Sequence, residues 1–321
     1  MEVFRGPWSN FVDVRDSAVT VGFFDGVHVG HRAILEELIS AAKAQSLRSV
    51  VLTFDTHPRH VLRETNAPIG LLTTSEEKLA LLAKTGVDLA LTVHFDPSLA
   101  QMTPADFVQI VLKGRIGMRK IVIGFNHGFG KGRMGDRETL IAMSRQLGFA
   151  VEVVNPTRVN DTIISSTYLR ELIADGQVAP AAEGLGRYYS IHGVVIHGYG
   201  RGKRLHWPTA NLGLISPGKL SPRDGIYAGI AHVRDETFPA AISIGYNPTF
   251  TEGKHSLEAH LIDFDRDIYD EELELEFVDR IRSEKKFSSE AELSGQIATD
   301  VNACAQLLTE RGLVRKVSGE R

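Results

Sequence analysis

Two histidines three residues apart, His28 and His31, flank Gly30 at the end of the segment Gly-Phe-Phe-Asp-Gly-Val-His-Val-Gly-His. An apolar run precedes this segment and apolar residues at helical spacing follow it, so the histidines stand where a strand passes into a helix. Free backbone N–H groups and the positive end of the helix dipole attract anions there, and Gly30 lets a ligand approach closely. Both imidazoles would share one helix face. The segment predicts a phosphate site.

Three further segments carry groups suited to nucleotide chemistry. Thr53–Pro58 (Thr-Phe-Asp-Thr-His-Pro) follows a predicted strand, and Gly124–Arg133 is a glycine-rich basic loop. Ser165–Arg170 opens a helix with three hydroxyl groups and a guanidinium group. Taken singly, Thr53–Pro58 is more often an ordinary turn and Ser165–Arg170 more often an ordinary helix cap, and the glycine-rich loop is as often a plain surface turn. Loops at the carboxyl ends of parallel strands line one crevice, so Thr53–Pro58 is expected near the histidines.

The second half holds a separate constellation. Val195–Asn211 is a glycine-rich basic run that ends in Pro-Thr-Ala-Asn. Thr209 and Asn211 alternate along an extended segment, so their side chains point to one side and offer two hard oxygen ligands to a phosphate-bound Mg²⁺. Alone, Pro-Thr-Ala-Asn is more often a turn.

The elements that must position these residues change character along the chain. In the first part, apolar strands alternate with amphipathic helices, which indicates an α/β fold with a parallel sheet covered by helices. Thr74 with Glu77 fits a capping box, and Thr103-Pro104 marks another helix start. The predicted strands are 18–24, 48–54, 87–94, 119–125 and 149–154, and the predicted helices are 31–45, 74–85, 104–113, 136–147 and 166–175.

Beyond residue 184 the pattern becomes short strands separated by glycine, proline and aspartate turns, which predicts an antiparallel β-barrel. Ser289 with Glu292 caps a terminal helix that reaches Leu308 and is expected to pack against the barrel. We therefore predict two domains, 1–183 and 184–321. The predicted barrel strands are 189–197, 226–233, 239–245, 257–262 and 273–279.

Composition excludes several classes of protein. The chain has 321 residues, 43% of them hydrophobic, and its net charge of −4 does not favour nucleic-acid or membrane-surface binding. A basic start followed by an apolar leader is absent, as is any apolar run long enough to span a bilayer, so a cytoplasmic protein is expected. The single cysteine, Cys304, leaves no internal disulfide or cysteine-based metal cluster and is predicted to be a packed thiol.

The histidine segment resembles the nucleotidylyltransferase superfamily, and its longer form resembles the bacterial bifunctional riboflavin kinase/FAD synthetases. Thr53–Pro58 is similar to that family's Thr-Phe-Asp-Pro-His-Pro, and Ser165–Arg170 matches its Ser-Ser-Thr-x-x-Arg. The resemblance implies a Rossmann-like domain that adenylylates FMN, with His28 and His31 donating hydrogen bonds to phosphate oxygens. It also implies ATP or flavin contacts by Gly22, Phe24, Asp25, Gly30, Asn126, Phe129, Ser165, Ser166, Thr167 and Arg170.

The second half resembles riboflavin kinases in three places besides Val195–Asn211. These are Ile244–Phe250 (Ile-Gly-Tyr-Asn-Pro-Thr-Phe), Ser256–His260 (Ser-Leu-Glu-Ala-His) and Ile281–Phe287 (Ile-Arg-Ser-Glu-Lys-Lys-Phe). By this resemblance Glu258 is the general base that accepts the proton of the flavin 5′-hydroxyl, and Thr209 and Asn211 hold Mg²⁺. The other implied ligand contacts are Gly198, Arg201, Gly202, Lys203, Pro208, Asn247, Arg282, Glu284 and Phe287.

The implied activities are phosphorylation of riboflavin to FMN by ATP, and adenylylation of FMN to FAD with release of pyrophosphate. The expected partners are ATP, riboflavin and FMN, with Mg²⁺ and without nucleic acid or membrane, in a monomer or weak homo-oligomer. Three residues depart from the family pattern: Ile163 replaces a frequent arginine, His127 an aromatic residue, and His206 a glycine.

Three alternatives stay open at this point. One of the two halves could have lost its activity, since Ile163 and His127 affect the first half and His206 the second. The protein could be a flavin-binding regulator without turnover, although a binder needs neither a proton acceptor nor a phosphate clamp. It could also adenylylate another acceptor, such as phosphopantetheine, which the kinase-like half disfavours.

Overall fold

The computed structural model describes residues 1–321 apart from 56–69, 199–206, 215, 217, 247–254 and 315–321. The chain forms two compact units, Met1–Ser166 and Thr167–Arg321, which are described separately below.

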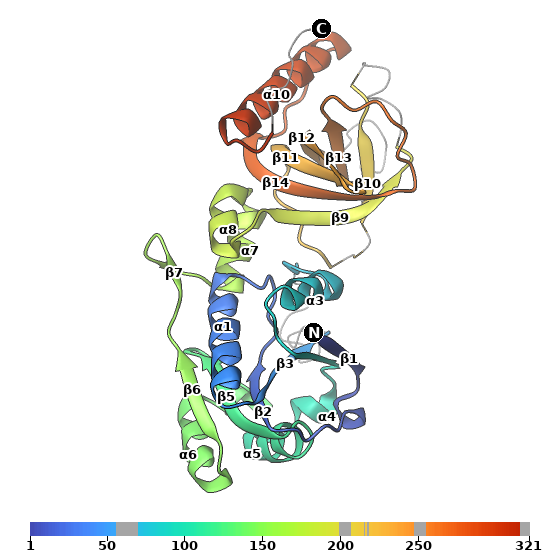
Figure 1. The fold of residues 1–321 in the computed structure, drawn as a ribbon. Helices are drawn as coiled ribbons and strands as arrows, with labels where there is room; N and C mark the ends of the chain where they lie inside the picture. Colours follow the sequence, from blue (N-terminus) through green and yellow to red (C-terminus); the bar gives the residue numbers. More distant parts are fainter. Residues whose placement is uncertain (56–69, 199–206, 215, 217, 247–254, 315–321) are drawn as a thin grey trace. The chain divides into compact units, whose positions relative to one another are not determined.

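The first unit is built on a six-stranded parallel sheet in the order β1-β4-β3-β2-β5-β6 (Figure 1). This arrangement confirms the predicted α/β class. The strands are β1 (Glu2–Gly6), β2 (Ser17–Val21), β3 (Arg48–Phe54), β4 (Leu89–Val93), β5 (Met118–Gly124) and β6 (Ala150–Val154). β2 and β4 are buried throughout, as expected of strands with helices on both faces.

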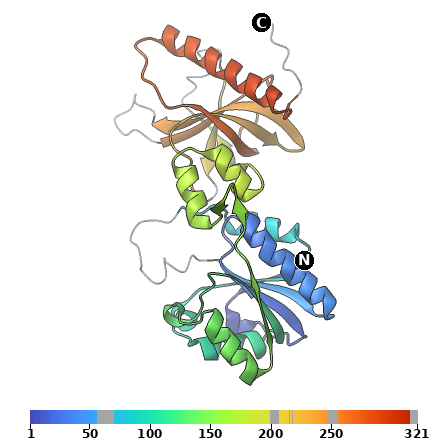
Figure 2. The same cartoon turned by 90° about the vertical axis from the view of Figure 1, so that its left-hand side faces the viewer.

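Helices cover both faces of this sheet, and Figure 2 shows α1 on one side and α6 on the other. Leu35 and Leu38 of α1 pack with Val51 and Val122, whereas Leu140 of α6 belongs to the core of the opposite face. The helical segments are η1 (Trp8–Asn10), α1 (Val29–Ala44), α3 (Ser75–Ala83), α4 (Pro97–Ala100), α5 (Pro104–Asp106), the π-helical η2 (Phe107–Lys113), η3 (Lys131–Arg133) and α6 (Arg137–Leu147).

Two predicted helix starts have the expected caps. The Thr74 side chain accepts from the Glu77 N–H while the Glu77 carboxylate accepts from the Thr74 N–H, and Thr103 accepts from the Asp106 N–H. Several elements differ from prediction: η1, α4 and η3 were not predicted, and the predicted helix 104–113 is divided into α5 and the π-helical η2. The first long helix begins at Val29, two residues early, because His28 serves as its N-cap. β1 was not predicted, because its pairing with β4 is a long-range contact.

The second unit contains a closed antiparallel barrel, as predicted. It has six strands in the order β10-β13-β12-β11-β14-β9, and β10 was not among the five that were predicted. Its strands are β9 (Tyr189–Ile196), β10 (Ala210–Leu214), β11 (Gly225–Val233), β12 (Glu236–Tyr246), β13 (His255–Leu261) and β14 (Glu272–Arg282). The helices are α7 (Ser166–Ala174), α8 (Val178–Leu185) and α10 (Glu290–Glu310), and a short hairpin, β7 (Arg158–Val159) with β8 (Thr162–Ile163), precedes α7.

The terminal helix α10 lies along the outside of the barrel (Figures 1 and 2). Val301, Cys304 and Leu308 pack against Ala228 and Val278. Cys304 is fully buried, and burial raises the pKa of its thiol to about 12. The prediction of a packed thiol is therefore confirmed.

The division between the compact units falls at Ser166/Thr167. We predicted a boundary near residue 184, which would leave α7 and α8 with the first domain. By contacts these helices group with the barrel, since α8 packs on β14 and β9. No helix in the described ranges is long and apolar enough to cross a membrane.

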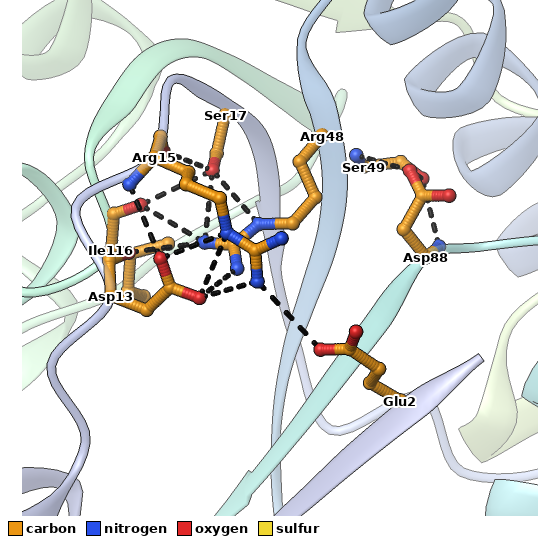
Figure 3. A network of polar contacts seen from close by, with 8 residues as sticks. All are labelled: Glu2, Asp13, Arg15, Ser17, Arg48, Ser49, Asp88 and Ile116. Atoms are coloured by element: carbon orange, nitrogen blue, oxygen red, sulfur yellow. Dashed lines mark hydrogen bonds and ion pairs between the residues drawn. The ribbon is translucent and has the colours of Figure 1, made fainter.

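A polar network ties together the amino-terminal ends of the parallel strands (Figure 3). Arg48, whose side chain is only 9% exposed, donates to the Asp13 carboxylate at 2.5 Å, to Ser17 Oγ at 3.2 Å and to the Ile116 carbonyl at 3.4 Å. Arg15 binds the same carboxylate at 2.6 Å. The network lies at the amino-terminal ends of the strands, whereas the predicted site lies at their carboxyl ends. Its role is therefore structural.

We predict that this network makes the first unit sensitive to acid. Hydrogen bonds from Arg15, together with those from Arg48, hold the pKa of Asp13 well below its usual value. A depressed folded-state pKa adds stability that is fully present above the unfolded pKa of about 3.9 and is lost as the pH falls through the folded value. Because the Arg15 side chain is largely exposed, solvent screens its contribution to the free energy of unfolding, and the buried Arg48 contributes more.

Asp13→Asn should therefore lower the free energy of unfolding at pH 7 by about 1.5–3 kcal/mol, as for hydrogen bonds to charged groups. Urea unfolding at pH 7 and pH 3 measures this, and the difference between variant and wild type should shrink at pH 3. An equal difference at both pH values would contradict the assignment.

Two candidate active sites

The first candidate site lies where the strand order of the parallel sheet reverses. β2 pairs with β3 on one side and with β5 on the other, although β5 comes after β4 in the chain. In open α/β sheets, ligands bind outside the carboxyl ends of strands at such a switch point. The histidine segment follows β2 and the Asn126 loop follows β5, so both lie at the carboxyl ends of these two neighbouring strands.

His28 and His31 are stacked on one another at the start of α1. Their ring centroids are 3.6 Å apart and the rings are 18° from parallel. His28 Nδ1 accepts a hydrogen bond from the His31 N–H at 3.3 Å, which leaves Nε2 as the protonated nitrogen of His28. His28 is 5% exposed, and the His31 ring meets the edge of Phe24 at 5.1 Å. The pair is thus oriented before any ligand binds.

The turn before α1 has a strained backbone. Phe24 has φ 53° and Val27 has φ 38°, both in the left-handed region that residues with a side chain seldom adopt. Such strain clusters at functional sites. A Cβ at Gly22 would press on the Phe24 ring, and one at Gly30 would lie 3.2 Å from the His28 ring. These two glycines make room for the side chains of the turn.

Asp25 anchors this turn. Its carboxylate accepts from the Leu72 N–H at 3.1 Å and from the Thr73 N–H at 2.9 Å, and Thr73 Oγ1 accepts from the Gly26 N–H at 3.0 Å. Ser166 Oγ donates to the Asp25 carbonyl at 2.9 Å. Sequence reasoning missed Thr73, because its contact with the turn spans 47 residues.

The loop after β5 presents one predicted residue and buries another. Asn126 is exposed, whereas Phe129 is buried in the core beside Phe107. A Cβ at Gly135 would overlap the Phe129 ring. His127 stacks on Phe129 with centroids 5.6 Å apart. Phe129 therefore anchors the loop in the core, and Asn126 is among the exposed residues of the loop.

The remaining residues predicted for the first site lie at the start of α7. Ile163 ends β8, and Ser166 is the first residue of α7. Thr167 and Arg170 follow within that helix, in the part of the chain that groups with the second unit.

The second candidate site lies on the outer face of the barrel, where β10 runs beside β13. Asn211 is directly opposite Glu258 in the ladder, so their side chains share one face. Thr209 Oγ1 donates to Glu258 Oε2 at 3.1 Å, and Ser256 Oγ donates to Glu258 Oε1 at 3.3 Å. The structure thus brings Thr209, Asn211 and Glu258 together. Ser256 was not predicted, although its spacing of two residues from Glu258 places it on the same face.

Gly198 supports this cluster through close packing. A Cβ at position 198 would overlap the side-chain amide of Asn211. Nearby, His260 Nδ1 contacts the Pro208 carbonyl at 2.8 Å, and the Trp207 ring meets His260 at 80°. The backbone around Pro208 is therefore fixed by the barrel.

We predict that Gly198→Ala displaces Asn211 and lowers activity of the second site alone. A displacement of about 1 Å at a reacting centre reduces rates by up to roughly 10²-fold. Steady-state kinetics for both reactions measure the effect, with Gly295→Ala on α10 as the control because a Cβ there has open space. A Gly198→Ala variant with unchanged kinetics would mean that Asn211 tolerates the shift.

The segment after β14 is held against both the barrel and α10. Arg282 donates to Asp300 with Nε at 2.9 Å and Nη2 at 2.6 Å, and Asp300 is 5% exposed. A Cβ at Gly245 would overlap the Glu284 carboxylate, so Glu284 lies on the end of β12. The Arg282 guanidinium lies 5.9 Å from the centre of the Phe287 ring.

Several predicted residues lie outside the described residues, namely Arg201, Gly202, Lys203, His206 and Asn247, together with the end of the Thr53–Pro58 segment. Within the described part of the chain, groups of three or more histidine, cysteine, aspartate or glutamate side chains that could hold a metal ion are absent. The hydroxyl oxygen of Thr209 and the amide oxygen of Asn211 are nevertheless hard donors, which suit Mg²⁺ already bound to phosphate.

Two family models match the chain, one to each half. The FAD synthetase model matches residues 11–168, and the riboflavin kinase model matches residues 185–308. These matches contain His28 and His31 in the first case, and Thr209, Asn211 and Glu258 in the second.

Curated relatives match over most of their length. The bifunctional riboflavin kinase/FMN adenylyltransferase of Listeria monocytogenes is 35% identical over 286 residues, which are 89% of this chain and 90% of the relative. The protein of the same name from Escherichia coli K12 is 34% identical over 88% of this chain and 90% of its own. A crystal structure titled macrolide-efflux protein from Streptococcus pneumoniae superposes with a TM-score of 0.87 and 30% identity, covering 95% of this chain and 99% of that one.

Proposed function

The chain belongs to the family of bifunctional riboflavin kinase/FMN adenylyltransferases, and from this premise we propose how its residues divide the two reactions. The protein phosphorylates riboflavin to FMN and adenylylates FMN to FAD. We assign adenylyl transfer to the site at the carboxyl ends of β2 and β5, and phosphorylation to the site on β10 and β13. The single observation that supports this division most strongly is the separate grouping of the stacked histidines and of the Thr209, Asn211 and Glu258 cluster.

In adenylyl transfer, a phosphate oxygen of FMN attacks the α-phosphorus of ATP and pyrophosphate leaves. The nucleophile is already an anion, so the reaction needs no protein base. His28 and His31 donate hydrogen bonds to oxygens on which negative charge grows in the transition state. Each such donor contributes about 2–4 kcal/mol, as oxyanion-hole donors do. The stacking of the two rings and the bond to His28 Nδ1 fix these donors in advance.

Arg170 and the hydroxyl groups of Ser165 and Thr167 are assigned to the phosphates of ATP. The support is their place at the start of α7, where helix N–H groups and hydroxyls bind anions. We assign a different role to Asp25. Its carboxylate is engaged by the Leu72 and Thr73 backbone, so it shapes the turn that holds the histidines.

In the kinase reaction, the 5′-hydroxyl of riboflavin attacks the γ-phosphorus of ATP and ADP leaves. A neutral alcohol must lose its proton as it attacks, and we assign Glu258 as the acceptor. Hydrogen bonds from Thr209 and Ser256 orient the carboxylate toward the shared face of β10 and β13. Thr209 and Asn211 would hold Mg²⁺, which when bound neutralises phosphate charge. We assign Arg282, Glu284 and Phe287 to the flavin side of this site.

We propose further that Mg²⁺ enters with ATP, that the protein acts in the cytoplasm, and that it works as a monomer or weak homo-oligomer. Macrolide efflux, for which the S. pneumoniae protein is named, gains no support from the residues described at either site.

Supplying the two flavins separately tests the proposed function. With riboflavin and MgATP, the ADP formed should equal the sum of FMN and FAD, and with FMN and MgATP, one pyrophosphate should form for each FAD. Formation of only one product would favour the alternative in which one half is inactive. Flavin binding without either product would favour the regulator.

A further inference from the structure

Lys78 is a buried charge that neither reaction described above uses. It lies on α3 and is 3% exposed. Its ammonium group donates to the Phe54 carbonyl at 2.7 Å and to the Phe23 carbonyl at 3.1 Å, and it lies 4.3 Å from the centre of the Phe23 ring. Taking an ammonium ion out of water is unfavourable, so the burial of Lys78 requires a compensating interaction or a function.

The two carbonyls belong to neighbouring strand ends at the first site. Phe54 ends β3, and Phe23 comes two residues after β2. Thr53 Oγ1 also donates to the Phe23 carbonyl, at 3.1 Å. Phe23 immediately precedes Phe24, the first residue of the turn with positive φ that leads to His28. Lys78 therefore joins β3 to the start of the histidine turn.

Two carboxylates attract the ammonium group from the same strand ends. These are Asp25 in the turn and Asp55 after β3, and the Asp55 carboxylate also contacts His94 Nδ1. On α3 itself, the neighbouring Glu77 carboxylate accepts from the Thr74 N–H. Burial lowers the pKa of Lys78 to about 8, against the opposing attraction of Asp25 and Asp55.

We propose that Lys78 is a positioning residue for adenylyl transfer, which holds the turn that presents His28 and His31 by binding the Phe23 and Phe54 carbonyls. This inference rests on the proposed function of the first site. Packing alone does not account for a lysine here, because a methionine of similar length would fill the space without a buried charge.

The test is Lys78→Met in the full-length protein, with Lys84→Met as the control because Lys84 is exposed at the end of the same helix. Lys78→Met should lower kcat for FMN adenylylation by roughly 10- to 100-fold, the range expected when reacting groups are misplaced by about 1 Å. KM for ATP should change less than kcat. Riboflavin phosphorylation should stay near its wild-type rate. The variant should remain folded, with an unfolding midpoint lowered by several degrees at most through the loss of two hydrogen bonds. Lys84→Met should match wild type throughout.

The pH dependence supplies a second measurement that a merely structural role would not produce. Wild-type adenylylation should fall above about pH 8, as Lys78 loses its proton. Its folded-state pKa lies below the ordinary value of 10.5, so the unfolded chain binds more protons between these values. The contribution of Lys78 to stability therefore rises with pH while activity falls. Kinase activity should lack this decline, and so should the Lys78→Met variant.

Equal adenylylation by Lys78→Met and wild type would overturn the inference alone. Parallel loss of both activities with a lower unfolding midpoint would also overturn it, because Lys78 would then be a stability residue. If the variant fails to fold, the wild-type pH profiles decide: adenylylation that stays constant through pH 9 contradicts the proposal. A wild-type protein that forms no FAD from FMN would instead overturn the proposed function, and this inference with it.

Discussion

Replacing Glu258 by glutamine should lower riboflavin phosphorylation by about 10²–10⁴-fold, the usual contribution of a general base. Glutamine has the same size. Its one side-chain oxygen can still accept from either Thr209 or Ser256, which contact the carboxylate at 3.1 and 3.3 Å, and its NH₂ group can donate to the other hydroxyl. It cannot take the proton of the 5′-hydroxyl. The chemical step should therefore slow while KM for ATP changes little. Initial rates of FMN formation measure the effect.

Two controls accompany this variant. Glu272→Gln changes an exposed glutamate of β14 in the same unit and should leave phosphorylation unchanged. Conversion of supplied FMN to FAD should also continue in Glu258→Gln, because an anionic phosphate nucleophile needs no base. Near-wild-type phosphorylation by a folded Glu258→Gln variant would show that another group or water accepts the proton.

Replacing His31 by alanine should lower FMN adenylylation by about 10²–10³-fold, as for the loss of one oxyanion-hole donor. The change also removes the ring that stacks on His28 at 3.6 Å, so the orientation of the second donor is affected. Riboflavin phosphorylation should stay unchanged, because its proposed residues lie in the other unit. Rates of pyrophosphate release from FMN and ATP measure the first effect.

A conservative variant separates the two contributions of His31. His31→Gln restores an N–H donor but no aromatic ring, so its loss should be smaller than that of His31→Ala. If phosphorylation and adenylylation fell together in folded His31→Ala, the assignment of one reaction to each site would be wrong.

Local patterns predicted much of the fold. The alternation of apolar strands and amphipathic helices indicated the parallel sheet, and the Thr74 and Thr103 caps are in place. Turn residues and short strands indicated the barrel. Helix caps, turns and hydrophobic periodicity each depend on residues that are close together in the sequence, so they can be recognised without the structure. Spacing also explains why Thr209 and Asn211 share a face with Glu258, once β10 and β13 pair.

Contacts between segments that are distant in the sequence could not be predicted. Lys78 reaches Phe23 across 55 residues, Arg48 reaches Asp13 across 35, and the pairing of β1 with β4 joins the start of the chain to residues 89–93. The different positions of Asn126 and Phe129 likewise depend on tertiary packing, since Phe129 packs beside Phe107 and Gly135. Gly30 was expected to admit a ligand, and its neighbour in the structure is the His28 ring.

The most direct test of the central claim is one time course with the purified wild-type protein. Riboflavin, ATP and Mg²⁺ are mixed with the enzyme, and the flavins are separated by chromatography at intervals. Two active sites on one chain predict that FMN forms first and is then converted to FAD. FMN that accumulates without FAD would contradict the adenylyltransferase assignment, and riboflavin that persists unchanged would contradict the kinase assignment.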